Sequence, residues 1–94
     1  MTLDDVIARR SQILAFARAR KASRLRLFGS VVRGESGPQN DVDFLVDFEA
    51  GASALDQAGL VRDLRGLLGV DVEVVSVGGQ QERHEGIRRE AIDL

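Results

Sequence analysis

The chain has 94 residues, 44% of them hydrophobic, and a formal net charge of −2 at pH 7, which predicts one domain over residues 1–94 with a single core. No apolar run approaches the roughly 20 residues of a membrane span, and no hydrophobic segment follows the N-terminus, so neither a membrane anchor nor a secretion signal is expected. The absence of cysteine excludes disulfides, zinc–thiolate sites and cysteine nucleophiles, and it suits a cytoplasmic protein.

The first part of the chain predicts a helix, a strand and a single turn of helix. Apolar residues at helical spacing predict a helix over about Thr2–Ala22. A short apolar run predicts a strand over about Leu25–Phe28, and Gly29 interrupts it. A turn of helix is expected over Ser30–Arg33, followed by a polar loop over Gly34–Asn40.

The rest of the chain alternates strands and helices. Strands are predicted over about Val42–Phe48 and Val70–Val77, and the helix between them begins near Ser53 and ends at Gly69. A last short helix is expected from about Glu82. Alternating helices and strands predict an α/β fold, α+β in some schemes, in which helices cover a sheet.

The break at Gly29 has the features of a phosphate-binding turn. Gly29 allows another group to approach the backbone closely, because it has no side chain. Ser30 is a good helix N-cap, and the first turn of a helix presents free N–H groups that can hold phosphate oxygens. A plain helix cap would explain Ser30 equally well, and the two roles are compatible.

Two carboxylates open the second predicted strand on one face. Asp41 and Asp43 are two residues apart, so in a strand their side chains point the same way at a backbone spacing of roughly 6.6 Å. Such a pair can share a divalent cation, and Mg²⁺ is typically held by one or two carboxylates together with substrate phosphates. The alternative is an exposed polar strand face, but Leu45 has the same parity, so the acidic row stops after Asp43.

The combination of Gly29-Ser30, a ten-residue spacer and Asp41-Val42-Asp43 resembles the signature of the DNA-polymerase-β-like nucleotidyltransferase superfamily. The short chain and the continuation Arg33-Gly34-Glu35 are most similar to its minimal members, the MntA-type antitoxins that act beside HEPN-domain toxins. The resemblance covers most of the chain, from residue 25 to residue 94. It implies a mixed sheet of three to four strands covered by helices, with the site on one exposed face.

The family places a third acid on a neighbouring strand, where it binds the catalytic metal and assists deprotonation of the attacking hydroxyl. Asp71 and Glu73 share one face of the third predicted strand. Minimal members carry an acid inside a Val-Asp-Val-Val type of run, and Val72-Glu73-Val74-Val75 is similar to it, with Glu in place of Asp. We therefore favour Glu73 over Asp71, and the alternative is that both acids only occupy the polar face of a strand.

Two cationic residues near the motifs have open roles. Arg33 can reach a nucleotide phosphate, or it can brace the loop by pairing with an acid. Many family members have Arg directly after Gly-Ser, whereas this chain has Val31, which removes one phosphate contact. His84 is the only histidine and lies in a polar stretch, so we expect it on the surface and not at the catalytic centre.

The resemblance implies a nucleotidyltransferase that uses ATP and two Mg²⁺ ions to move a nucleoside monophosphate, AMP above all, onto a hydroxyl. Its implied site residues are Asp41, Asp43 and Glu73 as catalytic metal ligands, and Gly29, Ser30 and Arg33 around the nucleotide. The implied acceptor is a tyrosine of a HEPN-domain toxin, which the transfer silences. The base preference and the oligomeric state, homo- or hetero-oligomer, stay open.

Two other functions also stay open. A catalytically idle binding module would neutralise a HEPN toxin by occlusion, and a free-standing enzyme would act on a small acceptor. Nucleic-acid binding is not favoured, because the aromatic residues are four Phe with no Trp or Tyr and offer few stacking platforms. The charges are unevenly distributed: residues 1–34 hold eight basic and two acidic residues, and residues 35–94 hold five basic and thirteen acidic residues. This distribution fits two solvated faces of opposite sign, or a basic region that attracts a polyanionic nucleotide.

Overall fold

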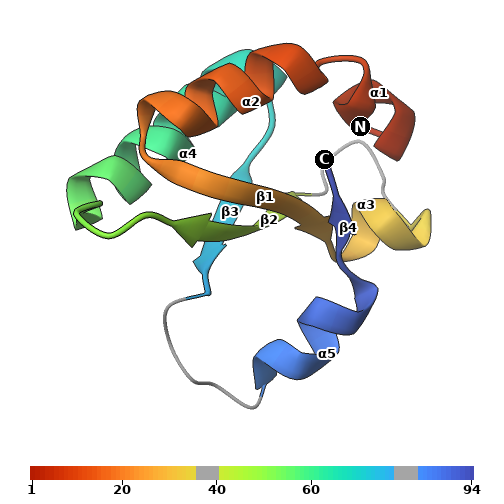
Figure 1. Cartoon of the computed structure of the whole chain (residues 1–94). Helices are drawn as coiled ribbons and strands as arrows, with labels where there is room; N and C mark the ends of the chain where they lie inside the picture. Colours follow the sequence, from red (N-terminus) through yellow and green to blue (C-terminus); the bar gives the residue numbers. More distant parts are fainter. Residues whose placement is uncertain (36–40, 78–82) are drawn as a thin grey trace.

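A four-stranded sheet forms the centre of the molecule, and the computed structural model describes residues 1–35, 41–77 and 83–94. The helices are α1 Leu3–Ile7, α2 Arg10–Ala19, α3 Ser30–Arg33, α4 Ala54–Leu68 and α5 Arg83–Glu90, and the strands are β1 Ala22–Phe28, β2 Val42–Phe48, β3 Val72–Ser76 and β4 Ile92–Asp93. α2 and α4 lie on one face of the sheet and α5 lies on the other side (Figure 1). None of these described helices is long and apolar enough to cross a membrane.

The sheet has the strand order β3-β2-β1-β4 and mixes both strand directions. β1 is antiparallel to β2 and to β4, whereas β2 and β3 are parallel and are connected through α4. The predicted mixed sheet covered by helices is confirmed, and its class is α+β. β4 was not among the strands predicted individually, because a strand of two residues is too short to show the alternation on which strand prediction depends.

The prediction of one helix over Thr2–Ala22 is wrong, because the structure has two helices and the start of a strand there. A capping box at Thr2 begins α1, and the chain tightens after it, where the Arg9 N–H donates to a carbonyl three residues back. α2 ends before Lys21, whose φ of 61° is left-handed, and Ala22 already belongs to β1. The apolar spacing continues through the break, so periodicity alone does not reveal it.

α4 and the two strands that it connects follow the sequence closely. The Ser53 hydroxyl caps α4 in a capping box with Asp56, and Gly69 ends the helix with a φ of 71°, as predicted. The second strand has its predicted bounds, Val42–Phe48, and the third is shorter than predicted, Val72–Ser76. α5 begins within one residue of its predicted start.

The core lies between the sheet and the layer formed by α2 and α4. Val42, Phe44 and Val46 of β2 point into it and are almost completely buried. The other buried side chains of this core include Ile13, Ala17, Leu25, Leu27, Leu60 and Leu64. On the opposite face of β2, Asp43 near its start is partly exposed, Leu45 is fully buried, and Asp47 near its end is again partly exposed. The predicted division, with one face covered and the other open at its start, is therefore observed.

Candidate active site

Two acidic side chains of neighbouring strands meet on the sheet face opposite the α2–α4 layer. Asp43 of β2 lies level with Glu73 of β3 in the parallel register, and the two side chains are hydrogen-bonded. Burial of Asp43, then the hydrogen bond and the charge of Glu73, raise the pKa of Asp43 from 3.8 to about 6. Two carboxylates this close favour a shared proton or a cation between them.

Asp41 lies at the start of the same face. It is exposed, and its negative charge also raises the pKa of Asp43. Among the side chains that the structure describes, those of residues 1–35, 41–77 and 86–94, no three acidic, histidine or cysteine residues are grouped so that they could hold a metal ion. The structure therefore brings two of the three predicted ligands, Asp43 and Glu73, into contact and leaves Asp41 beside them.

Asp71, the alternative third acid, lies before the first residue of β3 and is exposed. Its backbone carbonyl accepts the Val42 N–H at 3.0 Å, which fixes the register of the parallel pair. This register places Glu73, two residues further on, level with Asp43. The geometry favours Glu73 as the third acid, and the role of either residue stays a prediction.

Gly29 places the end of β1 against the carboxylate pair. Phe28 is paired with Asp43 across the antiparallel ladder, so the next residue lies at the edge of the acidic pair. Gly29 has φ 82° and ψ −156°, a backbone region that is essentially restricted to glycine. A Cβ added here would lie 2.2 Å from Oδ2 of Asp43. The absence of a side chain at Gly29 therefore allows the Asp43 carboxylate to pack directly against this turn.

Ser30 begins α3, but it is not the cap of this helix. The N-cap is Gly29 and Ser30 is the first helical residue, so the predicted capping by Ser30 is wrong. The backbone of Gly29 is the reason, because its positive φ lets the chain turn from strand to helix one residue earlier than predicted. Ser30 donates no hydrogen bond, from its hydroxyl or its N–H, to another described residue. Both groups remain available to a ligand.

Arg33 is held by two carboxylates. Its Nε donates to Glu35 at 2.9 Å, and its Nη1 donates to Oε1 of Glu90 at 2.5 Å. The other oxygen of Glu90 accepts the Gly29 N–H at 3.1 Å. Hydrogen bonds to Glu35 and Glu90 raise the pKa of Arg33, and the hydrogen bonds from Arg33 and Gly29 lower the pKa of Glu90. Of the two roles open for Arg33, the bracing role is the one seen here.

The sequence does not reveal the position of Glu90. The run Arg88-Arg89-Glu90 is typical of a solvated helix face with ion pairs one turn apart. The partners of Glu90 instead lie 57 and 61 positions away in the chain, at Arg33 and Gly29. No local pattern indicates contacts at that separation. The side chain of His84 lies outside the described part of the structure, so its predicted surface position is untested.

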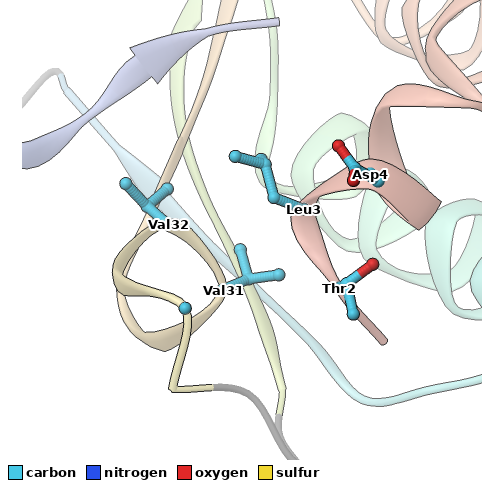
Figure 2. Close-up of a pocket in the computed structure, with 6 residues that line it drawn as sticks. Thr2, Leu3, Asp4, Val31 and Val32 are labelled. Carbon is cyan, nitrogen blue, oxygen red and sulfur yellow. The ribbon is translucent and has the colours of Figure 1, made fainter.

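A pocket of about 330 Å³ lies between α1 and α3 (Figure 2). Figure 2 shows Leu3 of α1 facing Val31 and Val32 of α3 across it. The described lining also includes Thr2, Asp4 and Gly34. It contains none of the predicted metal ligands, so this pocket is separate from the carboxylate pair.

The donor set at the carboxylate pair fits a divalent cation. Asp43 and Glu73 supply the hard oxygen ligands that Mg²⁺ prefers. A cation would relieve their mutual repulsion, which is evident in the raised pKa of Asp43. Gly29 lets the Asp43 carboxylate lie directly against the turn, because Oδ2 of Asp43 occupies the space that a Cβ would need.

The sequence profile of the nucleotidyltransferase domain matches residues 10–93. The chain belongs to the nucleotidyltransferase domain family. It is 35% identical over 72 residues to a protein assigned as a protein adenylyltransferase in Methanocaldococcus jannaschii, with 76% of this chain and 77% of that protein covered. It is 49% identical over 49 residues to the protein adenylyltransferase MntA of Thermococcus cleftensis, with 52% of this chain and 50% of that protein covered.

Solved structures of nucleotidyltransferases share the fold. A minimal nucleotidyltransferase superposes with a TM-score of 0.88 at 46% identity, covering 100% of this chain and 97% of the other. A toxin–antitoxin complex with AMP-PNP superposes with a TM-score of 0.76, covering 88% of this chain and 69% of the other, and at 20% identity this likeness concerns the fold alone. The predicted family, the predicted fold and the prediction of an enzyme that transfers nucleotidyl groups are confirmed.

Replacing Gly29 with alanine should lower the free energy of unfolding by about 1–3 kcal/mol, the usual cost of a residue held in a disfavoured backbone region. The new Cβ would also displace the Asp43 carboxylate, so nucleotide binding should weaken as well. Urea denaturation measures the first effect and calorimetry with ATP and Mg²⁺ the second.

Gly66→Ala is the matched control, because a Cβ there meets nothing within 4 Å and Gly66 lies inside α4. Alanine is the better helix former, so this variant should be as stable as the wild type or more stable. Equal stability of Gly29→Ala and the wild type would contradict the assigned backbone conformation.

Proposed function

We propose that this nucleotidyltransferase moves AMP from ATP to a hydroxyl of a protein partner, with Mg²⁺ as its metal. The observation that carries the proposal is the Asp43–Glu73 contact beside the turn at Gly29 and Ser30. A pair of carboxylates next to free helix-start N–H groups is suited to a metal-bound triphosphate. The two relatives assigned as protein adenylyltransferases support ATP as the donor and a protein as the acceptor.

Each residue of the site has a defined role. Asp41, Asp43 and Glu73 would hold the metal, with Asp43 between the other two in sequence. Gly29 lets the Asp43 carboxylate lie against the turn, and Ser30 donates its hydroxyl and its N–H to the terminal phosphates. When bound, Mg²⁺ neutralises phosphate charge and lowers the pKa of the attacking hydroxyl.

The reaction is a displacement at the α-phosphorus of ATP. The acceptor oxygen forms a bond to this phosphorus, the bond from the phosphorus to the oxygen that bridges to the β-phosphate breaks, and pyrophosphate leaves. The exposed Glu73 carboxylate accepts the hydroxyl proton. Ser30 holds the departing phosphates through its two donors.

The partner that we propose is a HEPN-domain toxin, which makes this protein a cytoplasmic antitoxin. A structural neighbour is the toxin–antitoxin complex of MntA with HpeT, which superposes with a TM-score of 0.70 at 19% identity. Together with the assigned protein adenylyltransferases, this neighbour supports a toxin as the acceptor. The acceptor group is a tyrosine hydroxyl of the toxin, and its adenylylation silences the toxin.

Incubation with the presumed HEPN toxin, ATP and Mg²⁺ should add the mass of one or more adenylyl groups to the toxin. One copy of the protein should modify many copies of the toxin, because a transferase turns over. The toxin should stay inactive after the two proteins are separated. Intact-mass spectrometry of the toxin measures the transfer, and the Asp41→Asn/Asp43→Asn double variant is the control that should transfer nothing.

An occluding antitoxin would give a different set of results. It would suppress the toxin only at stoichiometric amounts and would release a fully active toxin on separation. Suppressed toxicity without any gain in mass would therefore reject transfer in favour of occlusion.

A further inference from the structure

One carboxylate connects both ends of the short helix that follows the phosphate-binding turn. Glu90 is the last residue of α5, and its side chain is 25% exposed. Its Oε2 accepts the N–H of Gly29, the N-cap of α3, and its Oε1 accepts from Arg33, the last residue of α3. α5 is thereby tied to the turn across a separation of about 60 residues in the chain.

α3 needs such a tie because it is very short. It has four residues, and its own backbone bonds include those from Val32 and Arg33 to the Gly29 carbonyl, at 3.1 and 3.2 Å. A single turn of helix is not stable alone, since nucleation fixes several residues for few hydrogen bonds. The Gly29 N–H belongs to the Phe28–Gly29 peptide, and the next peptide carries the Ser30 N–H, so a contact from outside α3 that fixes the first peptide restricts the direction of the second.

The hydrogen bond to Glu90 and the contact with Asp43 use different sides of Gly29. The Gly29 N–H is directed at α5, whereas the position where a Cβ would lie is directed at Oδ2 of Asp43. Glu90 and the carboxylate pair therefore contact Gly29 in different directions. The positive charge of Arg33 offsets the negative charge of Glu90, which limits its repulsion of a nearby triphosphate.

We propose that Glu90 is a positioning residue for nucleotide binding, which fixes the Gly29 peptide and Arg33 so that Ser30 presents its donors level with Asp43. This inference rests on the proposed function. It makes α5 part of the nucleotide site without any contact between Glu90 and the nucleotide. Arg33 then acts as the second anchor of the turn, and its own contact with phosphate is not required.

Three substitutions test this role. Glu90→Ala removes both contacts, and Glu90→Gln keeps an oxygen that can accept the Gly29 N–H while it removes the charge that pairs with Arg33. Asp93→Asn is the matched control, because it breaks an exposed ion pair with Arg24, at 2.8 Å, in the same C-terminal segment. If Glu90→Ala does not fold, Glu90→Asp replaces it in the comparison with Glu90→Gln. The aspartate side chain is one methylene shorter, so its carboxylate cannot reach the Gly29 N–H and Arg33 together.

The first readout is the Gly29 amide resonance of the nucleotide-free protein, which is independent of activity. It should move upfield in Glu90→Ala and stay close to its wild-type position in Glu90→Gln and Asp93→Asn. The second readout is the Kd for ATP with Mg²⁺. It should rise about tenfold or more in Glu90→Ala, as expected for a lost hydrogen bond to a charged group, and Glu90→Gln should restore most of the affinity.

Steady-state kinetics separate positioning from a general loss of stability. Glu90→Ala should raise KM for ATP more than it lowers kcat, whereas a variant that is only less stable keeps the KM of its folded fraction. An unmoved Gly29 resonance in Glu90→Ala, or an unchanged Kd in folded Glu90→Ala, would overturn this inference and leave the proposed function standing. Tighter binding by Glu90→Ala would overturn it too, because it would show that the carboxylate competes with phosphate. Failure of the wild type to bind ATP with Mg²⁺ would reject the proposed function and this inference together.

Discussion

Replacing Asp43 with asparagine should reduce nucleotidyl transfer about a thousandfold or more and yet make the protein more stable at neutral pH. Asparagine keeps the shape of the side chain but removes a charged ligand. It also removes a half-buried charge that lies against Glu73; its burial, and then Glu73, raise the pKa of Asp43 to about 6. A residue that lowers stability while it enables chemistry is expected at a functional site.

The gain in stability should depend on pH. Because the pKa of Asp43 is about 6 in the folded protein against an ordinary 3.8, the folded state binds more protons than the unfolded state between these values. The wild type therefore loses stability as the pH rises from about 4 to about 6, and Asp43→Asn does not. Thermal denaturation should show a higher Tm for the variant at pH 7.5 and a much smaller difference at pH 4. A variant less stable than the wild type at pH 7.5 would contradict the raised pKa.

Asp47→Asn is the matched control, on the same strand and the same face. Its carboxylate accepts from the buried Arg26 at 3.0 Å, so its removal leaves a buried guanidinium without this partner. This variant should be less stable than the wild type at pH 7.5 by about 1–3 kcal/mol. Addition of Mg²⁺ should raise the Tm of the wild type and of Asp47→Asn but not that of Asp43→Asn.

The parts of the fold that are predictable from the sequence are those with a local physical cause. Alternation in Val42–Phe48 gives the bounds of β2, and Ser53 and Gly69 mark the ends of α4 through ordinary caps. The break between α1 and α2 has no comparable signal, because neither Gly nor Pro stands there. The end of α2 is equally unmarked, because Lys21 and not a glycine has the left-handed backbone that follows it.

The candidate site also has a part that the sequence predicts and a part that it does not. The period of two along a strand predicts that Asp41 and Asp43 share a face, but it cannot rank Glu73 against Asp71, since both have the same parity. The family-like run around Glu73 favours this acid, and the register of β2 on β3 places it level with Asp43. The contacts of Glu90 cannot be predicted from the sequence at all, because they join α5 to the turn that follows the first strand.

Replacing Glu73 with glutamine should reduce the transfer rate about a thousandfold, whereas Asp71→Asn should change it only severalfold. Glu73 is level with Asp43 and hydrogen-bonded to it, while Asp71 lies before β3 and is exposed. Single-turnover transfer to the partner at saturating ATP measures the step in which these acids act. The reverse ranking would place the acting acid two residues earlier on the chain.

The same two variants have a readout that does not depend on transfer. The hydrogen bond and the charge of Glu73 both raise the pKa of Asp43, so Glu73→Gln should lower that pKa from about 6 toward its ordinary value. Asp71→Asn should leave it near 6, because the charges that raise it are those of Glu73 and Asp41. NMR titration of the Asp43 carboxyl measures both shifts without Mg²⁺. An unchanged pKa in Glu73→Gln would show that the two carboxylates are not in contact in solution, and the proposed metal site would lose the pair on which it is built.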